Sequence, residues 1–439
     1  MRVGVVSLGC AKNRVDTEEM LSLLSQEGYE LTEKAEDAEV LVVNTCGFIT
    51  SAKEESIDAI FEMAQYKETG KCRALVVTGC LAQRYGEDLM REIPQIDVLS
   101  GVTQYDTLAE AIGIALEKGE RRMNTERKTA FLHCGRVLTT PKYTAYVRIG
   151  EGCDNRCAFC AIPLIRGRHH SRDMEDILGE MKGLSEQGVK EQILIAQDTT
   201  GWGRDLGPER LKDLLRRAAL EVAGLEWLRV LYCYPDGTDK ALIDEMAAHE
   251  NICRYLDLPL QHASRRILKA MRRRGDIDQV REVLCYARSL GFALRTTFIV
   301  GFPGETEEDF EELMAFCRDM RFDRMGAFTF SPEEDTAAAL MDGQIPEEEK
   351  KRRLDLLMSQ QAGISRERNE ARVGTVCRVL VTGRQAGLYT GRSAWEAPDA
   401  DGIIRFEAKQ TLKPGDFIDV RLTKAEPYDL IGAACEEPA

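Results

Sequence analysis

The sequence predicts an α/β protein with three parts: an N-terminal three-layer domain around a parallel sheet, a central partial βα barrel, and a small C-terminal antiparallel β-barrel. Three observations support this. Short apolar runs alternate with helical stretches over residues 1–136, and the alternation resumes at Tyr143 as a series of six strand–helix units. Beyond Ala371 the pattern changes to short strands separated by turns rich in Gly, Pro and Asp. The expected domain boundaries are 1–136, 137–371 and 372–439.

The N-terminal domain is expected to contain three strands, each followed by a helix. Repetition of strand, helix and strand indicates a parallel sheet with right-handed crossovers. The start of the chain is apolar for only a few residues and lacks a cleavage pattern, which indicates a buried strand and not a signal peptide. No apolar run approaches the roughly 18–20 residues of a membrane-spanning helix. We therefore expect a cytoplasmic protein without a membrane partner. The expected strands are Val3–Leu8, Val40–Asn44 and Ala74–Thr78, and the helices lie near Arg14–Gln26, Ala52–Tyr66 and Gln83–Glu92.

The central part is expected to place its chemistry at the carboxyl ends of its strands, as βα barrels do. A charged helix that begins at Pro346 connects it to the last domain. The expected central strands are Ala145–Ile149, Gln192–Ala196, Trp227–Leu231, Tyr255–Leu258, Ala293–Val300 and Arg324–Phe330, and the C-terminal ones are Val376–Thr382, Gly402–Phe406 and Phe417–Leu422.

The net charge is −15, and each of the three predicted domains is acidic. A protein that mainly grips a phosphate backbone usually carries a basic domain. An acidic surface suits a basic partner, although solubility alone also explains it. The chain has 14 cysteines. In a reducing compartment these are expected to be metal ligands or buried apolar residues instead of disulfides.

The most informative motif follows the first central strand. Cys153, Cys157 and Cys160 have the spacing C-x3-C-x2-C in a polar, Gly-rich loop. Such a loop can fold three thiolates around one face of a 4Fe–4S cluster, which leaves one iron open. A zinc site is the alternative, with His169 or His170 as the fourth ligand.

A second set of cysteines lies in the N-terminal domain. Cys10, Cys46 and Cys80 each come at the end of one of the three predicted strands. Carboxyl ends of parallel strands meet at one edge of the sheet, so the three thiols are expected to converge there. This favours a second three-cysteine cluster over simple packing. The remaining cysteines are interpreted as packing residues: Cys72, Cys134, Cys233, Cys253, Cys285, Cys317, Cys377 and Cys435.

The loop around Cys153, Cys157 and Cys160 resembles the signature of radical S-adenosylmethionine (SAM) enzymes. In that family the open iron is chelated by SAM, and an electron from the reduced cluster cleaves SAM to a 5′-deoxyadenosyl radical. The resemblance implies that other strand ends and loop residues contact SAM, although the two glutamines among them could instead be ordinary loop-capping residues. The implied contacts are Phe159 and Val300 beside the adenine, Arg172 at the carboxylate, Gln197 and Asp198 at the amino acid moiety, and Gln261 at the ribose.

The order of the three parts and the six cysteines resembles the methylthiotransferases over essentially the whole chain, with the C-terminal barrel corresponding to their TRAM domain, a substrate-binding module. The resemblance implies two 4Fe–4S clusters and a two-stage reaction. SAM methylates a sulfur at the auxiliary cluster, and a second SAM then yields the radical that abstracts hydrogen from the substrate, which takes the methylthio group. It also implies a sulfur donor and an electron donor such as flavodoxin or ferredoxin.

The methylthiotransferases divide into enzymes that modify an adenosine of tRNA and enzymes that modify an aspartate of a ribosomal protein at the decoding centre. The acidic charge and three sequence features resemble the protein-modifying (RimO-type) branch. We therefore expect methylthio transfer to the β-carbon of an aspartate in the twelfth small-subunit ribosomal protein. The alternatives are tRNA adenosine methylthiotransferase and an iron–sulfur protein without catalysis. The three features are residues 257–264, residues 161–167 and residues 391–402. In the first, the chain has His262, Ala263 and Ser264 where the tRNA branch shows a Ser-Gly-Ser sequence. In the last, Trp395 and Glu396 depart from the family's usual pair.

Overall fold

The computed structural model describes residues 1–129, 131–132 and 134–435 of the 439-residue chain. The chain divides into two compact units, each built from segments that are distant in sequence. In the described part of the chain, no helix combines the length and the apolar character needed to cross a membrane. The first unit comprises Met1–Pro141, Gly150–Arg172 and Ser331–Ala339, and the second comprises Lys142–Ile149, Asp173–Phe330 and Leu340–Ala439.

The first unit is built around a six-stranded parallel sheet with the strand order β2-β1-β3-β4-β5-β6. Strands β3 and β4 are buried at every residue, as expected when both faces of a parallel sheet are covered. The strands are β1 (Arg2–Ser7), β2 (Glu30–Leu31), β3 (Val40–Thr45), β4 (Ala74–Gly79), β5 (Val98–Ser100) and β6 (Arg122–Asn124).

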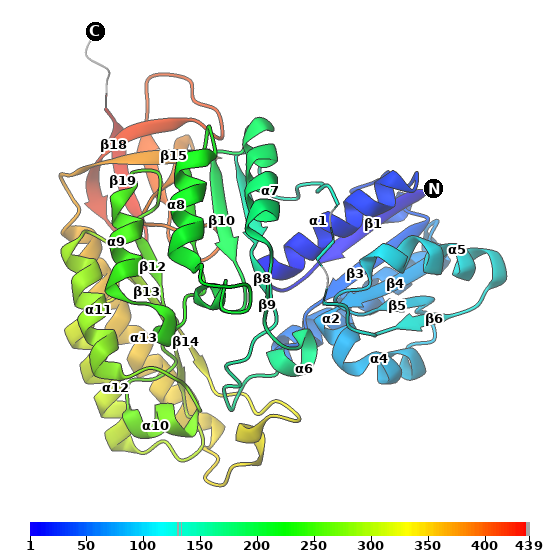
Figure 1. Cartoon of the computed structure of the whole chain (residues 1–439), viewed down its shortest axis with the longest axis horizontal. Coiled ribbons are helices and arrows are strands. Elements are labelled where there is room, and N and C mark those ends of the chain that lie inside the picture. Colours follow the sequence, from blue (N-terminus) through cyan, green and yellow to red (C-terminus); the bar gives the residue numbers. More distant parts are fainter. Residues whose placement is uncertain (130, 133, 436–439) are drawn as a thin grey trace. The chain divides into compact units, whose positions relative to one another are not determined.

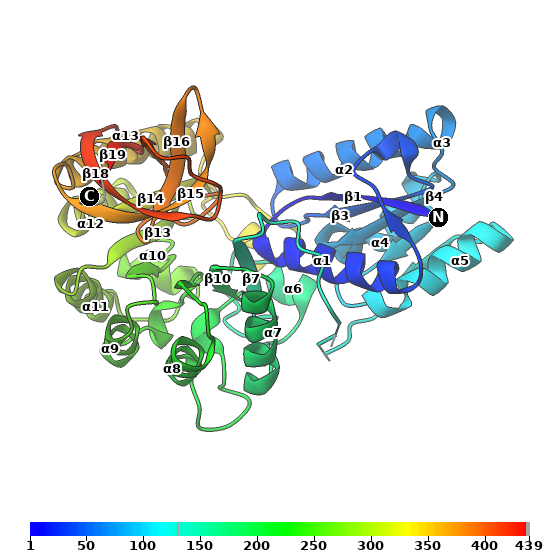
Figure 2. The ribbon, with the colours of Figure 1, turned by 90° about the horizontal axis from the view of Figure 1, so that it is seen from above.

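Helices cover both faces of this sheet and give it three layers. One core packs α1 and α5 against the sheet, and a second packs α2 and α4 against the opposite face. Figure 2 shows α1 and α2 on opposite sides of the strands. The predicted three-layer domain is therefore confirmed, although β2, β5, β6 and α5 were not foreseen. The helices are α1 (Ala11–Gln26), α2 (Thr50–Ala64), α3 (Tyr66–Thr69), α4 (Cys80–Glu92) and α5 (Leu108–Lys118).

Two further segments complete the first unit. One contains strands β8 (Gly150–Glu151) and β9 (His170–Ser171), which pair antiparallel and bring together the two ends of a long loop. Within that loop lies the short helix α6 (Ile162–Arg166), whose first turn contains Pro163. The other segment is Ser331–Ala339, which follows the last strand of the second unit in sequence.

The second unit contains six parallel strands in two three-stranded sheets, β7-β10-β11 and β12-β13-β14. A parallel bridge between Leu228 and Ile252 and a bond of 3.0 Å from Cys233 N to Asp257 O connect the two sheets. The predicted partial βα barrel is thus confirmed. The strands are β7 (Thr144–Arg148), β10 (Glu191–Ile195), β11 (Trp227–Val230), β12 (Tyr255–Asp257), β13 (Ala293–Val300) and β14 (Arg324–Thr329).

The helices of the second unit form an outer layer around these strands (Figure 1). Several begin with a side-chain cap that satisfies the free N–H groups of the first turn: Asp173 caps α7, Asp239 caps α9, and Thr306 forms a capping box with Asp309 at α12. The helices are α7 (Met174–Glu186), α8 (Leu211–Glu221), α9 (Lys240–Ala248), α10 (Arg265–Ala270), α11 (Ile277–Ser289), α12 (Glu307–Met320) and α13 (Glu347–Glu370).

The C-terminal part of the second unit is a closed barrel of five strands in the order β15-β16-β17-β19-β18. Four of its five pairings are antiparallel, as predicted, and the fifth, β17 with β19, is parallel. Strands β16 and β19 were not foreseen in the sequence. The strands are β15 (Val376–Gln385), β16 (Leu388–Ser393), β17 (Ile404–Glu407), β18 (Phe417–Ala425) and β19 (Leu430–Ala434).

A buried ion pair network joins this barrel to the start of β10. Glu191 is fully buried, and its carboxylate accepts hydrogen bonds from Arg229 of β11 (3.1 Å) and from Arg392 of β16 (2.5 Å). Burial alone would raise the pKa of Glu191, but the two guanidinium groups lower it to about 2. The carboxylate therefore stays charged at neutral pH.

A second network surrounds Glu396, in the loop after β16. Its carboxylate accepts bonds from Arg324 at the start of β14 (2.8 Å) and from Arg372 (2.5 Å), as well as from the backbone N–H of Ser393 (3.0 Å). Farther along the same loop, Asp401 accepts a 2.6 Å bond from the Tyr255 hydroxyl. The loop after β16 therefore fixes the C-terminal barrel to the amino ends of the βα strands.

Candidate functional site

The three N-terminal cysteines lie at one edge of the first unit's sheet. Cys10 lies between β1 and α1, Cys46 follows β3, and Cys80 is the first residue of α4, immediately after β4. Strands β1, β3 and β4 are neighbours in the sheet, so their carboxyl ends lie side by side. Cys10 is exposed, Cys46 is half-buried and Cys80 is buried.

The three thiols are close enough to influence one another. Burial raises the pKa of Cys46, and the charge of Cys10 raises it further. Burial also raises the pKa of Cys80 to about 11, and both Cys10 and Cys46 contribute in the same direction. Three neighbouring thiolates repel one another, so they can all be deprotonated only when a positive charge compensates them. The iron ions of a cluster provide that charge. The donor set therefore suits a cluster.

Glycines allow the three loops to approach closely. Gly9 has a φ of +90° and Gly79 a φ of +94°, a region that side chains with a Cβ rarely adopt. A Cβ on Gly9 would lie 3.2 Å from the Cys46 sulfur, and a Cβ on Gly79 would collide with the backbone of Thr45. The residues before Cys10 and Cys80 must therefore be small for the cysteines to converge.

Asn13 holds two of these loops together. Its Nδ2 donates bonds of 3.0 Å to the carbonyl oxygens of Leu8 and Thr45, and its Oδ1 lies 3.5 Å from the sulfur of Cys80. Ser56 gives further support to the loop at Cys46, because its hydroxyl accepts a 2.9 Å bond from the backbone N–H of Cys46 and donates to the carbonyl of the same residue. The thiols thus stand on loops that are fixed by side chains.

The second cysteine set lies in the loop between β8 and β9. Cys157 is buried, and Cys153 and Cys160 are half-buried. A backbone bond of 3.0 Å from Cys160 N to Cys157 O forms a tight turn, and the N–H of Cys153 donates to the carbonyl of Gly167 (3.2 Å). At Gly152 the φ is +72°, and a Cβ there would collide with the Arg168 carbonyl. The loop is closed at its base and turns sharply between its cysteines.

Neither cysteine set is gathered around a single ion. Among the residues that the structure describes, no group of three His, Cys, Asp or Glu side chains is close enough to hold one metal atom. In a 4Fe–4S cluster each thiolate binds a different iron. The assignment of all six cysteines as cluster ligands stays a prediction.

Helix α6 connects the two cysteine sets within the first unit. Ala161 and Ile165 pack against Cys80 and Val102 in one small apolar cluster. The last residue of the helix, Arg166, is buried and reaches the same cysteine. The sequence indicated residues 161–167 only as a feature of a family branch, so this contact was missed.

The segment Ser331–Ala339 binds to the same unit. Glu333 is buried, and its carboxylate lies 2.9 Å from the ammonium of Lys53 in α2 and 3.1 Å from the guanidinium of Arg84 in α4. The N–H of Ala338 donates a 2.8 Å bond to the carbonyl of Ala158, between the cluster-motif cysteines. The segment therefore connects the cysteine loop to both helices.

The residues expected to contact SAM are divided between the units. Phe159 and Arg172 are half-buried residues of the first unit. In the second unit Gln197 and Asp198 lie two and three residues after the end of β10. Asp198 accepts bonds from the Gly201 N–H (3.0 Å) and the Thr200 hydroxyl (2.7 Å), and so caps a short 3-10 helix. Its proposed contact with SAM stays a prediction.

Gln261 and Val300 lie beside each other in the second unit. Gln261 has a φ of +74° and exchanges backbone bonds with β13, donating to Thr297 O (2.8 Å) and accepting from Ile299 N (2.7 Å). Val300 is the buried last residue of β13. Both residues therefore lie toward the carboxyl ends of the barrel strands, where the family resemblance expects SAM, although no observation tests the contact itself.

His262 is a buried residue whose surroundings the sequence did not reveal. Its Nδ1 accepts a 3.0 Å bond from the N–H of Ser264, and its Nε2 lies 3.7 Å from the carboxylate of Glu305. That carboxylate accepts bonds from the N–H groups of Gly301 (2.7 Å) and Phe302 (3.1 Å). His262 thus packs behind the loop that follows Val300.

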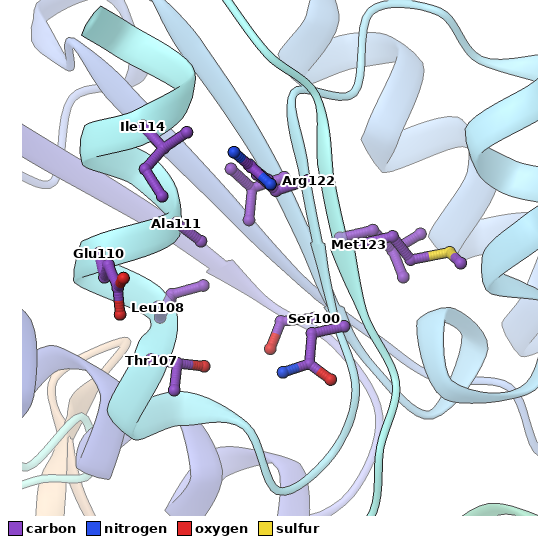
Figure 3. A pocket seen from close by; sticks show the side chains of 11 residues that line it. Ser100, Thr107, Leu108, Glu110, Ala111, Ile114, Arg122 and Met123 are labelled. Atoms are coloured by element: carbon purple, nitrogen blue, oxygen red, sulfur yellow. The ribbon is translucent and has the colours of Figure 1, made fainter. Parts of the chain in front are cut away.

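A pocket of about 250 Å³ lies elsewhere in the first unit, between α5 and the strands β5 and β6. Figure 3 shows Glu110 of α5 and Thr107, which precedes this helix, on one side and Arg122 and Met123 on the other. None of the described residues that line it is a cysteine. The pocket is therefore separate from the cysteine sites.

Three family models match successive parts of the chain. Residues 2–101 match the Uncharacterized protein family UPF0004, residues 147–317 match the Radical SAM superfamily, and residues 373–435 match the TRAM domain. Each match lies inside one of the three predicted domains. The boundaries at 136 and 371 are not tested by these matches and stay predictions.

Solved structures support the fold. A radical SAM methyltransferase, TsrM from Kitasatospora setae, has a TM-score of 0.54 at 17% identity, and the match covers 74% of this chain and 72% of that chain. The cobalamin-dependent SAM radical enzyme OxsB has a TM-score of 0.50 at 13% identity and covers 83% of this chain and 56% of that chain. These similarities concern the fold alone.

Much more similar relatives carry one name. The Ribosomal protein uS12 methylthiotransferase RimO of Desulforamulus reducens is 50% identical over 438 residues, covering 98% of each chain. The protein of that name from Pelotomaculum thermopropionicum is 49% identical and covers 98% of this chain and 99% of its own. The protein from Clostridium botulinum strain Langeland is 47% identical and covers 100% and 99%. This chain therefore belongs to the RimO family of ribosomal protein uS12 methylthiotransferases.

Proposed function

We propose that the chain adds a methylthio group to the β-carbon of an aspartate in ribosomal protein uS12, using SAM and two 4Fe–4S clusters. Relatives with this named activity match the chain over its full length at about half identity. The single structural observation that supports the proposal best is that one compact unit contains two separate cysteine triads, each on loops shaped by glycines and backbone bonds. Two triads would hold two clusters, each with one iron that no cysteine binds, and so would offer one such iron to each stage of the reaction.

Each triad has a distinct task in this proposal. Cys153, Cys157 and Cys160 hold the cluster that binds SAM, and the other three cysteines hold the auxiliary cluster. When bound, these groups supply the radical and the sulfur chemistry that an unactivated C–H bond requires, because such a bond offers no acidity to a general base.

The chain's own residues supply position and shelter. Asn13 fixes the loops at Cys10 and Cys46 through the carbonyls of Leu8 and Thr45, and Ser56 fixes the backbone of Cys46. Ala161 and Ile165 cover Cys80 with apolar surface, which excludes water from that side of the auxiliary site. The substrate aspartate would approach from the side of the exposed Cys10.

The partners follow from this chemistry. Ribosomal proteins are basic, so a chain of net charge −15 is suited to one of them as substrate. The proposal also requires a one-electron donor, such as flavodoxin or ferredoxin, and a sulfur donor. Ribosomal proteins and these small electron carriers meet in the cytoplasm, where we place the enzyme.

The test offers both acceptors to the reconstituted enzyme at once. Unmodified uS12 and unmodified tRNA are incubated anaerobically with enzyme, SAM, sulfide and reductant, and both are analysed by mass spectrometry. A methylthio adduct on an aspartate of uS12 is expected. An adduct only on adenosine would refute uS12 as the acceptor but would agree with the cluster assignment. Formation of 5′-deoxyadenosine without any adduct would show that neither acceptor is right.

The cluster assignment has its own test in iron content. The reconstituted chain is expected to bind about eight irons, two clusters of four. Cys46→Ala and Cys157→Ala should each lose about four of them. Cys285→Ala is the matched control, because Cys285 is exposed on α11 and should leave iron content unchanged. Equal iron in all variants would refute the two-triad assignment.

A further inference from the structure

Arg166, the last residue of α6, is a buried cation. Its guanidinium donates a 2.7 Å bond to Asn13 Oδ1 and lies 2.8 Å from the carboxylate of Asp16 and 3.2 Å from that of Glu151. The same Nη2 lies 3.5 Å from the sulfur of Cys80. Only 2% of the side chain is exposed, so these contacts are made without competition from water.

The partners of Arg166 come from both cysteine regions. Asn13 and Asp16 lie on α1, which begins directly after Cys10, and Cys80 begins α4. Glu151 lies in β8, at the base of the loop that carries the second triad, and Arg166 itself lies six residues after Cys160. All of these residues belong to the first unit. One guanidinium therefore spans the elements that carry the two triads.

The two carboxylates explain why the charge can remain. Burying a cation is costly unless opposite charges and hydrogen bonds compensate it. Burial opposes the charged form of Arg166, but its guanidinium lies 2.8 Å from the carboxylate of Asp16 and 3.2 Å from that of Glu151, and these two negative charges compensate it. A planar guanidinium can bond to all of these partners at once because its N–H groups point in fixed directions, which a lysine cannot reproduce.

We propose that Arg166 is a positioning residue of the auxiliary site: it donates an N–H···S hydrogen bond to Cys80 as cluster ligand, and this makes the auxiliary cluster easier to reduce. The proposal rests on the assignment of Cys80 as a ligand in the proposed function. One-electron reduction adds a negative charge to the cluster. A cation and a hydrogen bond at a ligand sulfur stabilise that charge, and hydrogen bonds to the sulfurs are a main determinant of cluster potential.

The proposal gives the cysteine loop a second task. The helix that carries Arg166 begins two residues after Cys160, so the loop expected to bind SAM also sets the electronic state of the other cluster. Asp16 and Glu151 hold the guanidinium in the position from which it reaches Cys80. The role is electrostatic and geometric, and Arg166 itself touches no substrate.

The test isolates the auxiliary cluster in the full-length chain. Cys153, Cys157 and Cys160 are replaced together by Ala, and this parent is reconstituted anaerobically, reduced and followed by iron content, electron paramagnetic resonance and redox titration. Arg166→Gln in this parent is expected to shift the reduction potential to a more negative value. Arg166→Lys, which keeps the charge and loses the planar fork, should shift it less.

The matched control is Arg168→Gln in the same parent. This substitution removes the same charge two residues away. The side chain of Arg168, however, is largely exposed, and its guanidinium pairs with Asp154. Its substitution should leave the potential of the auxiliary cluster unchanged. A potential that moves equally in both variants would show a general charge effect and would overturn the specific role of Arg166.

A measurement on the parent alone covers the case in which Arg166→Gln does not fold. The parent is grown with ¹⁵N-labelled arginine, and hyperfine spectroscopy of the reduced cluster is expected to detect a coupled ¹⁵N nucleus. Its absence would refute the hydrogen bond.

The outcomes also separate this proposal from the cluster assignment. If the parent binds no iron, the ligand assignment of the N-terminal triad is wrong and the role of Arg166 falls with it. If the parent binds its cluster and Arg166→Gln leaves the potential and the spectrum unchanged, only the role of Arg166 is wrong.

Discussion

Replacing Glu396 by Gln should weaken the attachment of the C-terminal barrel to the βα strands. Glu396 is 1% exposed and its carboxylate faces the guanidinium groups of Arg324 and Arg372. Glutamine keeps the size of the side chain and one carbonyl acceptor for the N–H of Ser393. The substitution therefore removes one negative charge and leaves two buried cations without it.

The structure gives the size of this effect in two ways. Burial raises the pKa of Glu396, but Arg372 and Arg324 lower it from 4.5 to about 2. A difference of that size corresponds to about 3 kcal/mol of stabilisation of the charged form. Breaking a buried ion pair from one side typically costs about 3–5 kcal/mol. We therefore expect Glu396→Gln to lower the free energy of unfolding of the second unit by about 3 kcal/mol.

Tryptophan fluorescence during urea unfolding can measure this loss. Two of the three tryptophans lie where the C-terminal barrel meets the rest of the unit: Trp395 stacks on Arg372 at 4.9 Å, and Trp227 packs edge-on against Phe417 at 4.9 Å. The matched control is Glu426→Gln, which breaks a half-exposed pair with Arg405 in the same barrel and should cost less than about 1 kcal/mol. A loss in Glu396→Gln no larger than in the control would refute the reasoning.

The same carboxylate predicts how the loss depends on pH. The folded-state pKa of Glu396 is depressed to about 2, so its contribution is complete above the unfolded value near 4.5 and disappears as the pH falls toward 2. The difference in the free energy of unfolding between the unmodified chain and Glu396→Gln should therefore be constant above about pH 5 and shrink below it. A difference that grows as the pH falls would contradict this sign.

Two further changes test the first unit. Glu333→Gln removes the carboxylate between Lys53 and Arg84. We expect the local stability of residues 331–339 to fall by about 2 kcal/mol, which makes their backbone hydrogen exchange more than about tenfold faster. Unchanged exchange would contradict the role of this ion pair. Gly79→Ala places a Cβ against the Thr45 backbone at a φ of +94°. We expect about 1–3 kcal/mol of backbone strain and the loss of roughly half the bound iron in reconstituted protein. Full iron content would show that the loop tolerates the change.

The sequence revealed the strand ends and with them the two cysteine triads. The predicted strands lie within one or two residues of β1, β3 and β4, because continuous apolar runs in a covered parallel sheet are a strong local signal. Once these strands are placed side by side, topology alone brings Cys10, Cys46 and Cys80 to one edge.

Side-chain networks between distant residues could not be predicted in the same way. Arg166 lies more than 80 residues from Cys80, and Glu396 lies 72 residues from Arg324, so neither contact leaves a local pattern. At Glu396 the sequence showed only a departure from the family's usual residues, whereas the structure explains it as the centre of a buried ion pair network. Short strands such as β5, with three residues, were also missed because they carry too few positions for periodicity.

The division of the chain has a consequence for biosynthesis. The unit with both cysteine triads is assembled from segments that end at residues 141, 172 and 339. A ribosome that releases the chain from its amino end delivers Cys10, Cys46 and Cys80 early, Arg166 later, and Glu333 only after most of the second unit has emerged. The nascent N-terminal sheet must therefore wait for distant segments before its cysteine edge is covered, and contacts of such large sequence separation form slowly. Iron–sulfur insertion during translation would thus meet an edge that α6 does not yet cover, and the whole unit is complete only when about three quarters of the chain has been made.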